Sequence, residues 1–357
     1  MILLKPLCGL EPNLEANLES FFRQDYPNFE IIFGTRDGTD AALAIVHKVQ
    51  QRYPHVATKI AFSGEPDRPN AKVCSLEKMY SHAAGDYFII SDSDVEVRPN
   101  YLREVIAPLL NPQVGLVTCL YRGVSTGGVW SRLEALGMSV EMTSGVLVAE
   151  MLEGMRFALG PTMAARRDTI DSVGGMASLA DYCADDYVLG QKVYALGQKV
   201  ELSTHVIDHI VNHRSFRASL LHQLRWMKST RFSRPAGHIG SGLTFAIPYG
   251  LLGLTVGLLS GHAAVGWALM AWAVLNRVLM SIAVGWGVVR DSYSLRDCWL
   301  YPVRDLLGFL LWCASFMGQT ILWRGRRYRL ENGGKMVRTG AVKPEESSGS
   351  ITVDNLA

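Results

Sequence analysis

Short apolar runs alternate with mixed polar and apolar stretches over the first third of the chain. The apolar runs have the length of strands buried on both faces, and we expect such strands at residues 2–7, 29–33, 58–62, 87–91 and 114–120. The stretches between them have helical periodicity, and we expect helices at residues 13–22, 41–51, 72–84 and 99–110. Strands that alternate with helices are typical of a parallel sheet, so the pattern predicts an α/β fold.

The pattern of the next hundred residues is less regular. Residues 140–157 carry a stripe of methionine and other apolar side chains at roughly helical spacing, which fits a core helix, the wall of a binding site or a helix on a membrane surface. We expect a helix at residues 185–196 that ends at Gly197, a strand at residues 200–211 and an amphipathic helix at residues 216–231.

Three long apolar segments follow, at residues 243–260, 263–289 and 306–323. No Asp, Glu, Lys or Arg lies between Arg234 and Arg277, and the first segment is long enough to cross a bilayer. A soluble protein would need an unusually large apolar partner to bury three such segments in succession. The sequence therefore predicts a membrane region after the α/β domain.

Basic side chains gather at both ends of this region. Such clusters usually face the cytoplasm or contact anionic groups. The clusters are Arg225, Lys228, Arg231 and Arg234 before it, and Arg324, Arg326, Arg327 and Arg329 after it. Three full spans would place them on opposite sides of the membrane, unless the charge bias fails locally. We expect instead that residues 306–323 are re-entrant or interfacial, because Arg304 and Asp305 shorten that segment.

Composition excludes several classes of protein. The chain of 357 residues has a net charge of +2, which gives no support for nucleic-acid binding. Its six cysteines have no CxxC spacing, so we expect reduced thiols and no zinc or disulfide framework. The chain begins at the first expected strand, without a signal peptide. We expect an α/β domain at residues 1–235, a membrane region with two or three apolar helices at 236–330 and a polar, disordered tail at 331–357.

Polar side chains that can carry chemistry follow the expected strands in a fixed order. In chain order they are Asp37, Asp92, Asp94, the pair Asp185-Asp186, and Arg225-Trp226. Carboxylates placed just after buried strands collect at the carboxyl edge of an α/β sheet, where such folds bind ligands. A fixed cation beside an aromatic face can contact a phosphate and a sugar or other acceptor.

This ordered set resembles the D, DxD, (E/D)D and (Q/R)xxRW series of inverting family-2-type glycosyltransferases. Further segments are similar to the ceramide glucosyltransferase family, whose bacterial relatives include hopanoid glycosyltransferases. They are Lys5-Pro6-Leu7 with Gly9, Ala71-Lys72-Val73, Ala184-Asp185-Asp186-Tyr187 and Trp323-Arg324-Gly325-Arg326-Arg327-Tyr328-Arg329-Leu330. The resemblance covers residues 1–330, and the ordered set is far more specific than the DxD element alone. It implies a GT-A (Rossmann-like) nucleotide-sugar domain followed by C-terminal transmembrane helices.

The resemblance also implies roles for these residues. Asp186 would be the general base that takes the proton of the acceptor hydroxyl. Asp94 would hold a divalent cation, Mg²⁺ or Mn²⁺, while the substrate diphosphate fills other positions around the ion. The implied nucleotide-sugar ligands are Asp37, Lys72, Asp92 and Glu11. The implied diphosphate or acceptor ligands are Arg225, Trp226 and Asp185.

Simpler structural roles remain open for several of these residues. Asp185 and Asp186 could cap a helix, Glu11 could complement a helix dipole, and Arg225-Trp226 could anchor a juxtamembrane helix. Glu96 lies close to the DxD element and is expected to be peripheral. Two positions depart from the family pattern: Asp185 stands where Glu is common, and His222 stands where Gln or Arg is usual.

One further pattern resembles a metal site. His205, His209 and His213 recur every fourth residue, which on a helix would align three imidazoles. The residues around them favour a strand, where such a spacing separates neighbours by roughly 13 Å. We therefore expect no metal ion bridging these histidines.

The function implied by the resemblance is transfer of a hexose from a UDP-sugar to a hydroxyl of a membrane lipid, with glucose and ceramide as first choice. A hopanoid polyol with UDP-N-acetylglucosamine, a processive polysaccharide synthase and a non-enzymatic membrane scaffold are the alternatives. We expect a multi-pass protein of a bacterial-type cytoplasmic membrane, with its catalytic domain facing the cytoplasm. Family members usually carry a transmembrane helix before the first strand, so we expect the true start to lie upstream of residue 1.

Overall fold

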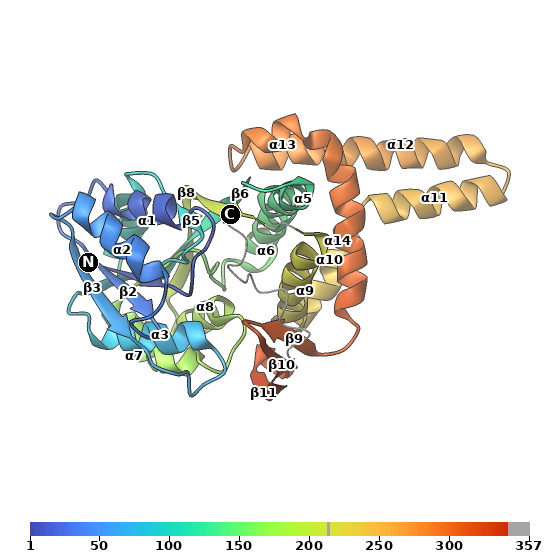
Figure 1. The fold of residues 1–357 in the computed structure, drawn as a ribbon. Helices are drawn as coiled ribbons and strands as arrows, with labels where there is room; N and C mark the ends of the chain where they lie inside the picture. Colours follow the sequence, from blue (N-terminus) through green and yellow to red (C-terminus); the bar gives the residue numbers. More distant parts are fainter. Residues whose placement is uncertain (213–214, 342–357) are drawn as a thin grey trace, which may run out of the picture.

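A computed structural model describes residues 1–212 and 215–341 of the chain. Its main part is an α/β domain built on an eight-stranded sheet with the order β3-β2-β1-β4-β7-β6-β8-β5 (Figure 1). These strands are β1 Ile2–Pro6, β2 Glu30–Thr35, β3 Ala57–Phe62, β4 Tyr87–Ile90, β5 Val95–Glu96, β6 Val114–Ser125, β7 Met163–Arg166 and β8 Lys199–Val211. All the strands expected from the apolar runs are present, and β6 is longer than expected.

The sheet is mixed, so the expectation of a parallel sheet was only partly correct. Strands β3, β2, β1 and β4 are parallel, but β7 runs antiparallel to both β4 and β6, and β5 runs antiparallel to β8. After β6 the chain passes through a helical segment outside the sheet. It then begins β7 at the same end of the sheet at which β6 finished. A strand that starts at the end of the sheet where the previous strand finished must run in the opposite direction.

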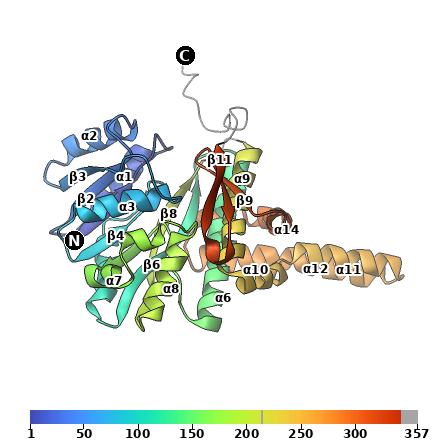
Figure 2. The ribbon, with the colours of Figure 1, turned by 90° about the horizontal axis from the view of Figure 1, so that it is seen from below.

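Helices cover both faces of the sheet, with α1 and α2 on one face and α3 on the other (Figures 1 and 2). This follows from right-handed crossovers, because the sheet order reverses direction after β3. The helices of this domain are α1 Leu14–Phe22, α2 Ala42–Arg52, α3 Ala71–Ser81, α4 Tyr101–Ile106, α5 Val129–Gly137, α6 Thr143–Glu153, α7 Arg167–Ser172, α8 Asp185–Ala195 and α9 Phe216–Ser233. Short 3-10 or π segments are η1 Ala107–Leu110, η2 Met138–Met142 and η3 Met176–Leu179.

Local chemistry explains where the helices near the site begin and end. The side chain of Asn70 accepts a hydrogen bond from the backbone N–H of Val73 at the start of α3, and Ser215 caps α9 in the same way. Gly197, with φ +78°, follows the end of α8. The helix expected at residues 99–110 divides into α4 and η1, because Pro108 lacks the N–H that would continue an α-helix.

The apolar stripe at residues 140–157 belongs partly to the core and partly to the surface. Val146 is 6% exposed and Met155 is 8% exposed, so both pack against the sheet. Met151 and Leu152, near the end of α6, are more than two thirds exposed, at 75% and 71%. Part of the stripe therefore packs in the core and part of it lies on the surface, because side chains on different faces of a helix point in different directions.

A helical hairpin projects from the α/β domain (Figures 1 and 2). It consists of α11 Ile247–Leu259 packed along α12 Ala263–Met280, and it is preceded by α10 Pro235–Ser241 and η4 Gly242–Thr244. By length and composition, Val129–Glu153 and Ala263–Trp286 could each cross a membrane, and the bent pair Pro235–Thr244 and Ile247–Leu259 could count as a third span. Half of the Val129–Glu153 window is buried inside the structure, against 22% for Ala263–Trp286. The projecting hairpin is thus the better candidate for contact with a bilayer.

The chain returns from the hairpin to the α/β domain. The returning elements are η5 Ser281–Trp286, α13 Ser292–Arg296, η6 Cys298–Leu300, α14 Tyr301–Ser315, β9 Thr320–Trp323, β10 Arg326–Leu330, η7 Asn332–Gly334 and β11 Met336–Ala341. The apolar segment expected at 306–323 is therefore not one helix, because it divides into the end of α14 and the strand β9.

Strands β9, β10 and β11 form a small antiparallel sheet that packs against the α/β domain. Leu330 and Met336 are buried with Cys183, and the backbone N–H of Met336 donates to the carbonyl of Asp181 at 2.7 Å. Two expected boundaries therefore change: residues 320–330 form the strands β9 and β10 instead of an apolar helix, and residues 331–341 form η7 and β11 instead of a disordered tail. The remainder of that expected tail, residues 342–357, lies outside the described residues.

The return of the chain also places the two basic clusters on the same side of the hairpin. Lys228 Nζ of α9 donates to the carbonyl of Thr320 at 3.0 Å, and a guanidinium nitrogen of Arg231 donates to the carbonyl of Ser315 at 2.7 Å. The end of α9 thus lies against the start of β9. The conflict expected from three full spans does not arise.

An ion-pair network fixes the base of the hairpin. Arg277 of α12 and Asp305 of α14 lie 3.0 Å apart and are both buried. The second oxygen of Asp305 accepts hydrogen bonds from the backbone N–H groups of Ala246 and Ile247, at the start of α11. One carboxylate thus ties together three helices and satisfies two backbone donors at a helix start.

Candidate active site

A cavity of about 1360 Å³ lies along the carboxyl edge of the first four strands. Its walls come from the loops after β1, β2 and β4, from α3, α6, α8, α9 and α10, and from the turn between β9 and β10. All the site residues expected from the sequence line it: Glu11, Asp37, Lys72, Asp92, Asp94, Asp185, Asp186, Arg225 and Trp226. Glu96, expected to be peripheral, lies on β5 and is exposed.

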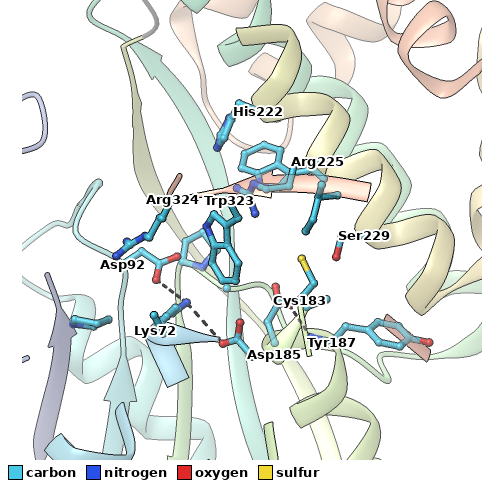
Figure 3. Close-up of a pocket in the computed structure, with 18 of the residues that line it drawn as sticks. Lys72, Asp92, Cys183, Asp185, Tyr187, His222, Arg225, Ser229, Trp323 and Arg324 are labelled. Carbon is cyan, nitrogen blue, oxygen red and sulfur yellow. Dashed lines mark hydrogen bonds and ion pairs between the residues drawn. The ribbon is translucent and has the colours of Figure 1, made fainter. Parts of the chain in front are cut away.

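Lys72 links two of the acidic positions (Figure 3). Its Nζ lies 2.6 Å from Oδ1 of Asp92 and 3.8 Å from Oδ2 of Asp185. Burial lowers the pKa of Lys72, but the charges of Asp185 and Asp92 outweigh that effect and raise it overall. Asp185 is buried, and its other oxygen accepts from the Asn70 side chain at 3.3 Å. Asp185 therefore orients Lys72 and Asn70, while Asp92 and Lys72 face the cavity together.

Asp94 is brought beside a histidine of the neighbouring strand. Val95 pairs with His209 in the β5–β8 ladder, so the residue before β5 lies next to His209. Oδ2 of Asp94 is 3.4 Å from Nε2 of His209. Oδ1 of Asp94 is buried, and no hydrogen bond to it comes from the described residues. A buried carboxylate oxygen without a donor, next to an imidazole, fits a divalent cation.

Asp186 lies at the start of α8. Its Oδ1 accepts a hydrogen bond from the backbone N–H of Tyr187 at 2.8 Å. Burial and the neighbouring charge of Asp185 raise the pKa of Asp186 to about 6, although Lys72 and backbone hydrogen bonds act in the opposite direction. The carboxylate is therefore ionised at neutral pH and more basic than an ordinary aspartate, as a general base requires.

Gly160 lies between the two carboxylates that face the reaction space. A β-carbon at this position would come within 3.2 Å of Oδ2 of Asp186 and 3.8 Å of Oδ2 of Asp92. A larger side chain here would crowd both groups. Glycine at this position thus leaves room for Asp186 and Asp92 to face the same space.

Lys5, which is buried, and Glu11, which is half-buried, hold the DxD loop in place. Lys5 Nζ donates to the carbonyl of Asp92 at 2.5 Å and to Oγ of Ser91 at 3.2 Å. Burial lowers the pKa of Lys5 to about 7. Ser93 Oγ donates to Glu11 at 2.5 Å, and burial together with the charge of Asp94 raises the pKa of Glu11 to about 7. Glu11 therefore positions the loop as well as lining the cavity.

Asp37 marks the outer end of the cavity. Its Oδ1 accepts from the backbone N–H and from the hydroxyl of Thr39, at 2.8 Å and 2.5 Å. The side-chain hydrogen bond from Thr39 holds the pKa of Asp37 below its ordinary value. The second oxygen of this exposed carboxylate is available to a ligand.

The opposite wall is formed by α9 and the β9–β10 turn. The guanidinium of Arg225 lies 5.5 Å from the ring centre of Trp323 (Figure 3), and burial lowers the pKa of Arg225. The rings of His222 and Trp226 are 4.4 Å apart. His222 Nδ1 lies 2.7 Å from Oε1 of the buried Glu134, so α5 fixes its orientation.

Sequence reasoning missed three residues of this site. His209 was set aside with the other histidines because no ion could bridge all three of them. His205 and His209 lie on strand β8, as expected, while His213 lies outside the described residues. His209 alone reaches Asp94, and no sequence spacing indicates this contact. Gly160 and Arg324 were missed as well, although the Gly160-Pro161 dipeptide and the basic motif around Arg324 were visible signals.

The arrangement combines the elements of a group transfer between a phosphorylated donor and an alcohol. Lys72, Arg225 and Arg324 supply positive charge for phosphate groups. Asp94 and His209 can hold a cation near them. Asp186 supplies a base in the same cavity.

Comparisons with known proteins show what this chain is similar to. Two relatives from Caenorhabditis elegans match nearly the whole chain. Ceramide glucosyltransferase 1 is 26% identical over 340 residues, which cover 93% of this chain and 72% of that protein. Ceramide glucosyltransferase 3 is 22% identical over 350 residues, which cover 94% and 73%. A solved mannosyltransferase from Pyrobaculum calidifontis, in complex with GDP-Man and Mn²⁺, is 18% identical with a TM-score of 0.48 and covers 87% of this chain and 86% of that chain.

The chain also matches a family model. The model of glycosyl transferase family 21 aligns with residues 1–336. This range contains the α/β domain, the hairpin and most of the small sheet, and with them every residue of the cavity. The chain therefore belongs to glycosyl transferase family 21 and is a glycosyltransferase.

Proposed function

We propose that the protein transfers a hexose from a UDP-sugar to a hydroxyl of a membrane lipid, with inversion at the anomeric carbon and with the help of a divalent cation. Glucose transfer from UDP-glucose to ceramide is the first choice. One observation carries the proposal: a raised-pKa carboxylate, Asp186, shares a cavity with the Asp94–His209 pair and with Lys72.

The donor would occupy the half of the cavity at the carboxyl ends of β1, β2 and β4. Asp37 would accept hydrogen bonds from the nucleoside, and Asp92 would accept them from the ribose. Lys72 lies between Asp92 and the start of α8, where its charge can reach the diphosphate. Arg225 and Arg324 approach from the opposite wall, so the diphosphate would meet positive charge on two sides.

Asp94 and His209 fit a divalent cation. They provide one carboxylate and one imidazole, and Mg²⁺ or Mn²⁺ bound to a nucleotide typically takes only one or two protein ligands. When bound, the cation would stabilise the negative charge that develops on the leaving diphosphate. The Lys5 and Glu11 contacts would keep the DxD loop in the conformation that presents Asp94.

Asp186 would act on the acceptor. The acceptor oxygen attacks the anomeric carbon, its proton passes to Asp186, the bond from that carbon to the diphosphate breaks, and UDP leaves. A single displacement of this kind inverts the configuration of the sugar carbon. Gly160 allows the base to lie close to the donor-side carboxylate Asp92.

A lipid acceptor is supported by two features. The curated relatives that match most of the chain are ceramide glucosyltransferases. The projecting hairpin exposes large apolar side chains, among them Trp267 at 60% and Trp272 at 62%, in a stretch without charged residues. We propose that this hairpin lies in the cytoplasmic membrane of a bacterial-type cell and that the cavity faces the cytoplasm, where UDP-sugars are available.

The test is transfer of labelled sugar into lipid by membranes that contain this chain. UDP-glucose and UDP-N-acetylglucosamine are each paired with ceramide and with a hopanoid polyol, with Mn²⁺, with Mg²⁺ and with a chelator. A β-linked glycolipid from an α-linked donor, formed only with the cation, is the expected result. Product formed only with the hopanoid polyol would mean that the acceptor is a hopanoid and not ceramide. Absence of every product from protein that binds UDP-sugar would overturn the lipid assignment.

A further inference from the structure

The cavity continues beyond the reactive carboxylates into a half that a nucleotide sugar does not need. At about 1360 Å³ it exceeds the range of about 300–1,000 Å³ that is usual for small-molecule pockets. The extra space is lined by small and apolar side chains from η2, α6, α9 and α10. They include Met142, Gly145, Val146, Leu224, Gly237 and Ser241.

This second half is open between α6 and α10. Gly145 of α6 is exposed although it lines the cavity, and a β-carbon at this position would meet nothing within 4 Å. On the other side of the opening, Gly237 and Ser241 of α10 are half-buried and line the same cavity. Gly145 therefore leaves its side of the opening free, whereas the space beside Gly237 holds the flexible side chain of Arg234, 2.8 Å from a β-carbon at that position.

The outer faces of the same two helices are apolar. On α6, Met151 and Leu152 are 75% and 71% exposed. Beside α10, Ile239 and Leu243 are 61% and 78% exposed. Large apolar side chains at this exposure on adjacent elements mark a surface that a partner covers. The apolar hairpin begins at Ile247, shortly after Leu243, and α10 lies at the base of the hairpin (Figure 2), so these exposed side chains lie next to the proposed membrane contact.

A charged contact lies at one end of the opening. Arg234, between α9 and α10, forms an ion pair with Glu153 at the end of α6. Its guanidinium lies 5.6 Å from the ring centre of Phe157, and both residues line the cavity. Arginine at the rim of an apolar surface is typical of the level of lipid head groups.

We propose that the space between α6 and α10 is a lateral portal through which a long-chain lipid alcohol reaches Asp186 without leaving the bilayer. Its alkyl chains would stay against the exposed faces of α6 and α10, and its hydroxyl would enter between Gly145 and Ser241. This inference rests on the proposed function, because it assigns the route and the chain-binding surface of the lipid acceptor.

The test uses a matched pair of tryptophan substitutions in the full-length protein. Gly145→Trp places an indole in the portal. Gly128→Trp is the control, because Gly128 is also an exposed glycine with negative φ whose β-carbon would meet nothing within 4 Å, but it lies before α5, outside α6 and α10, and does not line the cavity. Binding of UDP-glucose with Mn²⁺ is measured by equilibrium dialysis, and transfer is measured with long-chain ceramide in vesicles and with a water-soluble short-chain ceramide.

With the portal as proposed, Gly145→Trp binds UDP-glucose as the unmodified protein does. It loses about tenfold or more of its transfer to long-chain ceramide and loses less with the short-chain acceptor. Gly128→Trp behaves like the unmodified protein with both. Normal long-chain transfer by Gly145→Trp overturns the portal and leaves the proposed function intact. Absence of transfer by the unmodified protein overturns the proposed function itself, and the portal with it.

A second measurement does not depend on turnover. A ceramide with a photoreactive diazirine in its acyl chain is irradiated in vesicles that contain the protein, and the labelled peptides are mapped. Labelling of residues 142–153 and 235–244, reduced by Gly145→Trp, is expected. Labelling that is confined to the α11–α12 hairpin would place the acceptor elsewhere and contradict the portal.

Discussion

The imidazole Nε2 of His209 lies 3.4 Å from the carboxylate Oδ2 of Asp94. The two residues are 115 positions apart in the chain, and they meet because β5 pairs antiparallel with β8. This contact changes a lone carboxylate after a strand into a two-residue site that can hold a cation. It also means that the donor side of the cavity depends on both halves of the sheet.

His209→Ala should weaken the response to metal without abolishing nucleotide binding. Loss of one imidazole ligand should raise the Mn²⁺ concentration for half-maximal transfer by about tenfold or more. Titration of transfer activity with Mn²⁺ measures this shift. His47→Ala, on the exposed face of α2, is the control and should titrate as the unmodified protein does. An unchanged Mn²⁺ response in His209→Ala would remove His209 from the metal site.

Asp186→Asn should abolish transfer and leave UDP-sugar binding nearly intact, because an amide cannot take the proton of the acceptor. We expect a loss of at least about a hundredfold in the rate of transfer. The folded-state pKa of Asp186 is raised to about 6, so its ionised form destabilises the folded protein at neutral pH. The temperature of unfolding should therefore stay the same or rise in the variant. An active Asn variant would exclude Asp186 as the base.

The rate of transfer should rise with pH through about 6 and then level off. A carboxyl group acts as a base only when deprotonated, and burial together with Asp185 raises the pKa of Asp186 to about 6. The dependence of transfer on pH between about pH 5 and pH 8 measures this, at saturating donor and cation. A rate that does not change over that range would assign the proton transfer to a different group.

Asp305→Ala should strongly destabilise the protein. It would leave the buried guanidinium of Arg277 without its partner and remove the acceptor for two backbone N–H groups at the start of α11. Removing one partner of a buried pair costs about 3–5 kcal/mol, whereas an exposed pair contributes about 1 kcal/mol or less. Asp25→Ala, which breaks the exposed pair with Arg103, is the matched control.

Thermal unfolding of the purified protein in detergent, followed by tryptophan fluorescence, compares the two variants. Asp305→Ala should unfold at a clearly lower temperature, and Asp25→Ala should unfold close to the unmodified protein. Equal unfolding temperatures for Asp305→Ala and the unmodified protein would mean that the ion pair does not hold the hairpin to the α/β domain.

The sequence alone determined the strands expected from the apolar runs and a set of site residues that all line the cavity. Apolar runs of strand length that are followed by aspartates predicted Asp37, Asp92 and Asp94 at the carboxyl edge of the sheet. This prediction needs only local information, because residues that directly follow a strand lie at the end of that strand. The start of α8 followed from the pattern at Asp185-Asp186, since helix starts and periodicity are local properties. The resemblance to ceramide glucosyltransferases depended on the same motifs and agrees with the family match.

Only the tertiary structure decided the contacts between distant segments. The apolar stretch at residues 306–323 contains no local signal that distinguishes a membrane helix from a helix followed by a strand, and pairing with β10 made the difference. Residues 331–341 are polar enough to suggest a tail, but Leu330 and Met336 bury against Cys183 and order the segment. The partner of Asp94 is likewise set by strand pairing across the sheet. Such interactions depend on the packing of the whole chain, which short-range patterns do not encode.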